Sequence, residues 1–205
     1  PCAAPTVDQV AVVVYSASQT ASNAGPDQSI CLPTNSVSLS ANSVISPATG
    51  VWTLISGSGT ITSPNTPNTT VTGLGIGENI FRWTISNGPC SPTQTVDQVS
   101  IIVFNNAQAA ANAGPDQSFC EPVSSATLVG NTATFPATGQ WTWVSGPTTP
   151  VITAPSSATT QVTGLGVGAN VFRWTITNGP CAPASTNDEV TIFIFDADQA
   201  AANAG

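Results

Sequence analysis

The chain has 205 residues, of which 40% are hydrophobic and only 6% are charged, with a formal net charge of −8 at pH 7. Arg82 and Arg173 are the only cations, and this excludes nucleic acid as a partner because phosphate binding depends on Lys and Arg. The absence of Lys and His also argues against an enzyme, since a Ser or Cys nucleophile has no ordinary base beside it.

An internal repeat organises the sequence. The run ASNAGPDQSICLP from residue 21 returns as AANAGPDQSFCEP from residue 110, and AANAG begins again at residue 201. Asn23, Asn112 and Asn203 are therefore separated by 112−23 = 89 and 203−112 = 91 residues. A unit of this size fits one immunoglobulin-like sandwich and exceeds the repeats of most solenoids.

The repeat predicts the domain boundaries. Residues 1–22 match the end of a unit, so we expect them to be the last strand and linker of a preceding repeat. Whole repeats follow at 23–111 and 112–202, and residues 203–205 begin another. No run reaches the roughly 18 apolar residues of a membrane span, and no signal peptide opens the chain. We expect an internal piece of a secreted protein that does not insert into a membrane.

The predicted elements are all strands. Apolar residues alternate in VSLSA, WTL, IFRWTIS and VSIIVF, which Gly, Pro, Asn and Thr clusters separate. GLGIG and GLGVG lie between strand patterns and are interpreted as hairpin turns, because neither the helix nor the GK[ST] of a phosphate loop follows. Trp143 occupies the position of Leu54, and packing in the core or at a joint is expected for every aromatic residue. The predicted core of the first repeat comprises Val37, Leu39, Trp52, Leu54, Phe81, Trp83, Ile85, Val99, Ile101 and Val103.

Three motifs together resemble a known family: NAGPDQ, the following WTxxSG run, and FRWTISNGPC with DxV after it. They resemble the PKD-like and immunoglobulin-like tandem repeats of giant bacterial surface adhesins and gliding-type fibre proteins. The resemblance covers nearly the whole chain and implies all-β, about seven-stranded sandwiches arranged as beads on a string. The strand VWTLISGSG departs from the WDFGDG-like strand of PKD repeats, so a ligand role of the family's aspartates does not transfer.

The five cysteines follow the repeat. Because the first and sixth strands of such a sandwich are expected to meet at one pole, we predict disulfides Cys31–Cys90 and Cys120–Cys181. Cys2 is then left for a partner outside this segment. A thiolate metal site is disfavoured because no CxxC pair or His is present. Disulfides indicate an oxidising, extracellular compartment.

Most acidic residues also recur, at positions that predict a cation site. The first and last strands of each repeat are expected to run side by side, with the loop after the second strand at the same pole. Oxygen ligands that converge there, with no Lys to neutralise them, suit Ca²⁺. The alternative is that Asp and Asn bond backbone amides at turns and strand ends. The candidate ligands are Asp8, Asp27, Asp97, Asp116, Asp188, Asn23, Asn112, Asn42 and Asn131. Arg82 and Arg173, on an outward face, are expected to form solvated ion pairs worth under about 1 kcal/mol.

Two functions remain open from the sequence. The first is a structural repeat segment of a secreted bacterial extracellular filament or adhesin stalk, stiffened by disulfides and by Ca²⁺ at the repeat junctions. Its partners would be further copies of the repeat, with surface glycans or other cells as possible ligands. The second is a spacer or carbohydrate-binding module of a secreted hydrolase. The number of repeats in the whole protein would distinguish them.

Overall fold

The computed structural model describes residues 6–198, which divide into two compact units. The first unit contains residues 6–28 and 36–101, and the second contains residues 29–35 and 102–198. The short segment 29–35 thus groups with the second unit, although its sequence belongs to the first repeat. No helix in residues 6–198 has the length and apolar character needed to cross a membrane.

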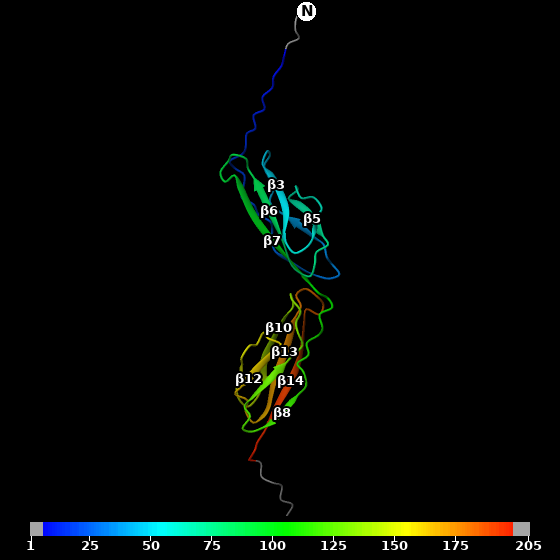
Figure 1. The fold of residues 1–205 in the computed structure, drawn as a ribbon, viewed down its shortest axis with the longest axis vertical. Helices are drawn as coiled ribbons and strands as arrows, with labels where there is room; N and C mark the ends of the chain where they lie inside the picture. Colours follow the sequence, from blue (N-terminus) through cyan, green and yellow to red (C-terminus); the bar gives the residue numbers. More distant parts are fainter. Residues whose placement is uncertain (1–5, 199–205) are drawn as a thin grey trace, which may run out of the picture. The chain divides into compact units, whose positions relative to one another are not determined.

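The first repeat forms two facing sheets (Figure 1). The four-stranded sheet has the order β1 (Gln28–Cys31), β7 (Gln94–Phe104), β6 (Gly77–Ser86) and β3 (Thr49–Ser56). The three-stranded sheet has the order β2 (Val37–Ser40), β5 (Asn68–Thr72) and β4 (Thr60–Ile61).

The second repeat has the same topology. Its larger sheet is β10 (Thr138–Ser145), β13 (Gly168–Thr177), β14 (Ser185–Phe195) and β8 (Gln117–Cys120). Its smaller sheet is β11 (Val151–Ile152), β12 (Thr159–Thr163) and β9 (Ser125–Val129). Strands β8 and β14 run parallel, whereas the other recorded pairs are antiparallel. The predicted all-β tandem of seven-stranded immunoglobulin-like sandwiches is confirmed.

A tryptophan pair lies at the centre of each core. Trp52 faces Trp83 across β3 and β6, with ring centroids 5.2 Å apart, and Trp141 faces Trp174 at 5.1 Å. Alternation along the central strands buries one side chain in two, as predicted. The other buried large side chains of the first repeat are Val37, Leu39, Val71, Leu74, Phe81, Ile85, Val99, Ile101 and Val103.

The prediction that Leu54 belongs to the core is wrong. Leu54 is 40% exposed, and Trp143 at the equivalent position is 38% exposed. Both lie on edge strands, and the pairing register shifts immediately after each of them. The alternation of buried and exposed side chains that buries Trp52 and Trp141 therefore does not extend to Leu54 and Trp143, two residues further on.

The GLGIG and GLGVG turns are not hairpins. The first follows β5 and leads into β6, and these strands belong to different sheets. Asn79 is 1% exposed just after this turn, and its amide donates to Gly75 O at 2.9 Å and to Ile101 O at 3.3 Å. Its Oδ1 accepts from Ser58 N at 2.8 Å, so one side chain joins this turn to the larger sheet and to the loop between β3 and β4.

The segment before the first whole repeat contains no strand over residues 6–22. A strand needs a neighbour to accept its ladder bonds, and the described residues provide none there. Residues 16–22 nevertheless dock on the first unit. Gln19 Oε1 accepts from Ile45 N at 2.7 Å, and Ser22 Oγ donates to Thr95 O at 2.8 Å. Cys2 and residues 203–205 lie outside the described residues.

Candidate functional site

The most distinctive local structure of each repeat is the NGPC turn between the last two strands. In the second unit Cys181 N donates to Asn178 O at 3.1 Å, and Asn178 N donates to Ala184 O at 2.7 Å. The turn passes through Gly179 with φ at +51°, a backbone conformation that side chains rarely adopt. The motif therefore closes a compact loop that presents a cysteine.

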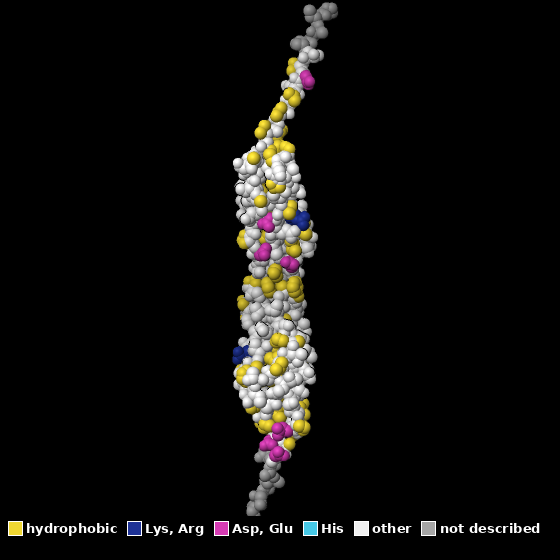
Figure 2. Space-filling model, turned by 90° about the vertical axis from the view of Figure 1, so that its left-hand side faces the viewer, with side chains coloured by type: hydrophobic (Ala, Val, Ile, Leu, Met, Phe, Trp, Pro, Cys, Tyr) yellow, Lys and Arg dark blue, Asp and Glu magenta, His cyan; other side chains and the backbone are white. Residues whose placement is uncertain are grey.

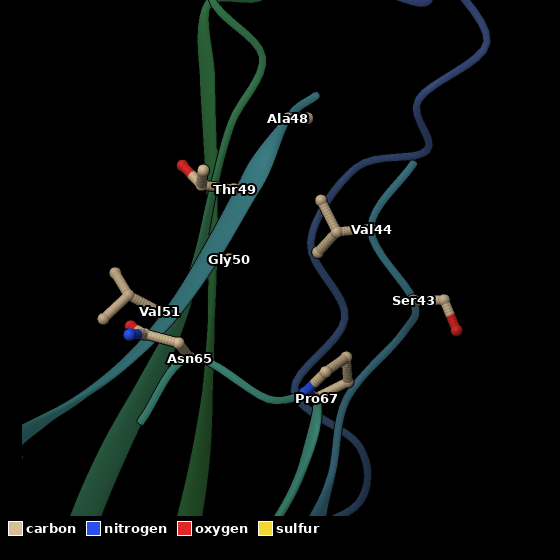
Figure 3. Close-up of a pocket in the computed structure, with 8 residues that line it drawn as sticks. All are labelled: Ser43, Val44, Ala48, Thr49, Gly50, Val51, Asn65 and Pro67. Carbon is tan, nitrogen blue, oxygen red and sulfur yellow. The ribbon is translucent and has the colours of Figure 1, made fainter. Parts of the chain in front are cut away.

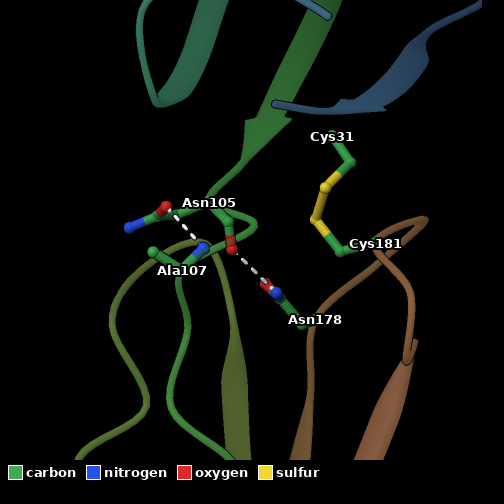
Figure 4. The surroundings of a disulfide bond; sticks show 5 residues. All are labelled: Cys31, Asn105, Ala107, Asn178 and Cys181. Atoms are coloured by element: carbon green, nitrogen blue, oxygen red, sulfur yellow. Dashed lines mark hydrogen bonds between the residues drawn. A yellow bond between two sulfur atoms is a disulfide. The ribbon is translucent and has the colours of Figure 1, made fainter. Parts of the chain in front are cut away.

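The linker that enters the second unit packs against this turn. Asn178 Nδ2 donates to Asn105 O at 2.8 Å, and Asn105 Oδ1 accepts from Ala107 N at 2.9 Å (Figure 4). The ring of Phe104 lies over Gly179, where an added Cβ would come within 2.5 Å of Phe104 Cε2. Glycine at this position thus allows an aromatic ring to contact the backbone.

The structure joins Cys31 to Cys181, with 5.1 Å between their Cα atoms (Figure 4). Leu32 N donates to Phe104 O at 3.0 Å, so the end of β1 is fastened beside the same aromatic residue. Both cysteines lie in the second compact unit, but Cys31 belongs to the first sequence repeat and Cys181 to the second. Cys181 is buried with 3% of its surface exposed.

The predicted pairs Cys31–Cys90 and Cys120–Cys181 are therefore wrong. Strand β8 runs parallel to β14, with Cys120 opposite Phe195 at the end of that strand, whereas Cys181 precedes its beginning. An 11-residue strand such as β14 spans roughly 35 Å. The two cysteines of one repeat thus lie at opposite ends of its sheet. Cys90 and Cys120 carry thiols in this structure.

The first unit contains the same turn with the same linker contacts. Cys90 N donates to Asn87 O at 3.1 Å, and Asn87 Nδ2 donates to Ser16 O at 2.9 Å. The Tyr15 ring covers Gly88, with Tyr15 Cζ 2.5 Å from an added Cβ. The repeated NGPC is visible in the sequence, and so are the matching positions of Tyr15 and Phe104, but the roles of its Asn and Gly become clear only in the structure.

The predicted cation ligands on the first strand and the preceding loop bond backbone amides. Asp27 Oδ1 accepts from Ser100 N at 2.7 Å, and Asp116 Oδ1 accepts from Thr191 N at 2.8 Å. Asp27 and Asp116 directly precede the first strand of their repeat, and each carboxylate accepts an amide from the middle of the neighbouring last strand. This is the amide bonding at strand ends that the alternative interpretation describes.

The aspartates of the last strand make the reciprocal bonds. Asp97 Oδ2 accepts from Ala24 N at 2.7 Å, and Asp188 Oδ2 accepts from Ala113 N at 2.8 Å. Because Asp116 contacts Thr191, three residues beyond Asp188, the two carboxylates of one unit are attached about 10 Å apart along the ladder. A single Ca²⁺ needs its oxygens at roughly 2.3–2.6 Å.

The predicted asparagine ligands also accept from amides. Asn42 Oδ1 accepts from Asn23 N and Asn131 Oδ1 from Asn112 N, both at 2.8 Å. The Oδ1 atoms of Asn23 and Asn112 in turn accept from glycine amides two residues on, both at 2.9 Å. Asp8 is exposed and accepts only from Gln9 N. Among residues 6–198 no group of three or more His, Cys, Asp and Glu is placed to hold a metal ion.

The two arginines differ. Arg173 Nε and Nη2 donate to Glu189 Oε1 at 3.0 and 2.6 Å, and both side chains are 44% exposed. The expected solvated pair is confirmed for Arg173, with little effect on stability. Arg82 Nε is buried without a hydrogen-bond partner in the described residues. Figure 2 shows few charged side chains over most of the face it presents, and a group of acidic side chains gathered at its lower end.

Each unit also has an open hollow beside its first tryptophan strand. In the first unit it measures about 570 Å³ and lies between Val44, Gly50 and Pro67 (Figure 3). In the second unit the matching hollow of about 290 Å³ includes Gly139 and Ala158. Small or uncharged side chains line both, without a charged group to orient a ligand.

Comparison with known proteins gives a consistent assignment. The family model described as "K319L-like, PKD domain" matches residues 24–103 and 113–194. The mouse dyslexia-associated protein KIAA0319 homolog is 29% identical over 165 residues, which are 76% of this chain and 15% of that protein. The chain thus spans a small fraction of that relative's length.

Solved structures of similar domains were also found. The PKD domain from the KIAA 1837 protein is 25% identical with a TM-score of 0.38, and covers 47% of this chain and 96% of its own. Sidekick-1 immunoglobulin domains 1–4 are 12% identical with a TM-score of 0.46, covering 84% of this chain and 47% of theirs.

Proposed function

Because the chain belongs to the K319L-like PKD domain family over both of its repeats, we propose that it is a structural segment of a secreted bacterial extracellular filament or adhesin stalk. In this role the segment connects neighbouring parts of the filament or stalk and sets the distance between them, without catalysis. The observation that carries the proposal is the disulfide between Cys31 of the first sequence repeat and Cys181 of the second. A disulfide persists in an oxidising compartment, which supports an extracellular location.

Features of the surface support the same role. Two near-identical sandwiches follow one another, their charged groups are sparse, and the linker of each is held by a repeated set of bonds. The partners in this function are further copies of the repeat, and surface glycans or other cells would be contacted elsewhere on the protein.

The test is to find where the repeat resides on its native cell. An antibody raised against the 205-residue chain should label intact, unpermeabilised cells, and gold-labelled particles should follow extracellular filaments in electron micrographs. Labelling that requires permeabilisation would contradict the proposal.

The alternative function is a carbohydrate-binding or spacer module of a secreted hydrolase. The hollow at Gly50 and Gly139 favours it because it recurs at the same place in both units. A glycan array probed with the whole chain distinguishes the two functions. The substitutions Val44→Trp and Ala133→Trp fill the first and the second hollow. Saccharide binding that is reproducible in the native chain and lost in this double variant would favour the module.

Calcium at the repeat junctions also remains a prediction. Each of these aspartates uses one carboxylate oxygen for its amide bond, and within residues 6–198 the second oxygen has no hydrogen-bond partner. A Ca²⁺ ion would therefore bind to one carboxylate at a time, and water would complete its coordination shell.

A further inference from the structure

We propose that Cys90 and Cys120 are the two halves of the same kind of disulfide site that Cys31 and Cys181 complete. Cys120 would bond the NGPC cysteine of another copy of the repeat, and Cys90 would bond the strand-end cysteine of another copy. Every repeat would then carry one disulfide to each of two neighbours. Each half closely reproduces the surroundings of the matching cysteine in the completed site.

The Cys120 half repeats the surroundings of Cys31. Val123 N donates to Cys120 O at 3.2 Å, as Thr34 N does to Cys31 O at 3.1 Å. Glu121 N donates to Phe195 O at 3.0 Å, which reproduces the bond from Leu32 N to Phe104 O. The backbone that presents the thiol is thus already in the bonded arrangement.

The Cys90 half repeats the surroundings of Cys181. The turn bonds of Asn87 match those of Asn178, and Tyr15 covers Gly88 as Phe104 covers Gly179. In the completed site the end of a first strand is hydrogen-bonded beside the aromatic residue. Among the described residues, the Cys90 half has no such strand beside Tyr15.

Exposure indicates which surface awaits a partner. Phe104 and Tyr15 are half-buried against their glycines, whereas Phe195 at the same repeat position is 52% exposed. Cys120 beside it is exposed, and Cys90 is half-buried where Cys181 is buried. An exposed aromatic residue next to an exposed thiol matches the Gly-Pro-Cys surface of another NGPC turn. The occupant is therefore another copy of this repeat.

The chemistry balances as an ordinary thiol oxidation. The two thiols lose two protons and two electrons as the sulfur–sulfur bond forms, and a disulfide oxidant such as oxidised glutathione accepts both to give two thiols.

The experiment extends the chain by one natural unit. Residues 115–205 are repeated once after Gly205, which gives 205 + 91 = 296 residues with an uninterrupted repeat. Cys2 is replaced by Ser, the protein is oxidised with glutathione at several protein concentrations, and remaining thiols are alkylated before non-reducing peptide mapping. A matched chain carries Cys120→Ser.

We expect two disulfides in the extended chain, Cys31–Cys181 and Cys120 with the added copy of Cys181. Cys90 and the added copy of Cys120 should be alkylated. The Cys120→Ser chain should retain only Cys31–Cys181 and show the same circular dichroism. If the partner is instead supplied by a second chain, the same peptides appear in a species of twice the mass, and its share rises with concentration.

Three outcomes would overturn the proposal: a Cys90–Cys120 bond, a bond within one repeat, or an alkylated Cys120 in a folded, oxidised chain. A second measurement does not depend on the extended chain. The natural protein is isolated from its source and denatured in the presence of maleimide. The number of labelled thiols should then be several times smaller than the number of repeats. One labelled thiol per repeat or more would contradict the ladder of disulfides, whatever becomes of the proposed filament function.

Discussion

A single buried amide holds together the connection between the two sheets in each unit. Asn79 and its counterpart Asn170 have exposed fractions of 1% and 0%, and each donates to backbone oxygens of the turn before it and of the neighbouring strand. Polar groups buried in this way are costly to leave without partners.

Replacing Asn79 by Ala should therefore lower the free energy of unfolding by about 2–3 kcal/mol, because it leaves buried backbone groups unpaired. Urea unfolding followed by tryptophan fluorescence measures the change. The control is Asn65→Ala, at an exposed position whose effect should stay within about 0.5 kcal/mol. Equal effects of the two substitutions would refute the role assigned to Asn79.

The calcium prediction can be separated from amide capping at Asp27 and Asp116. Asn at these positions keeps an oxygen that accepts the amide of Ser100 or Thr191 but removes the charge. If calcium binds, chelation should lower the melting temperature of the native chain and leave the Asp27→Asn, Asp116→Asn variant unchanged. A melting temperature that is the same in all four conditions leaves capping as the only role of these residues.

At the scale of elements, the fit between the NGPC turn and the incoming aromatic residue depends on glycine. Gly179→Ala should lower the unfolding free energy by about 3 kcal/mol, because it adds the cost of a left-handed backbone to a clash with Phe104. Gly164→Ala is the matched control, since its φ is +81° but its Cβ would meet nothing closer than 3.8 Å. Its cost should be only about 1–2 kcal/mol. Chemical denaturation of both variants gives the difference, and equal losses would mean that the ring does not constrain the turn.

The strands and their inward faces could be predicted because alternation is a local property of the sequence. Phe81, Trp83 and Ile85 are buried as their period of two requires. Leu54 could not be placed, since its exposure depends on the sheet order and on a register shift that no local pattern reveals. The GLGIG turn joins two sheets for the same reason: a turn signal marks a reversal but not the strand that the chain will pair with next.

At the scale of the whole molecule, the pairing of the cysteines is the feature that the sequence predicts least well. Repetition identifies which cysteines are equivalent, but every equivalent set permits pairing within a repeat or from one repeat to the next. The parallel pairing of the first and last strands decides the matter, because it carries Cys31 and Cys120 away from the turn of their own repeat.

Removing the bond with Cys31→Ser and Cys181→Ser should reduce the unfolding free energy by about 2–5 kcal/mol, since the cysteines close a loop across 150 residues. The paired control is Cys90→Ser with Cys120→Ser, which removes two thiols and no disulfide, and should change stability by less than about 0.5 kcal/mol. Guanidinium unfolding under oxidising conditions measures both. A reversed order of effects would contradict the pairing.

The same bond determines how the chain responds to a pull on its two ends. The shortest covalent route passes from Cys31 directly to Cys181, so strands β2 through β13 lie inside a closed loop that carries no load. At roughly 3.3–3.6 Å per extended residue, this loop withholds about 500 Å of contour length from the stretched chain. A reductant would release that length. Single-molecule stretching before and after reduction would therefore report the oxidation state of the protein as a difference in the maximum extension of the chain.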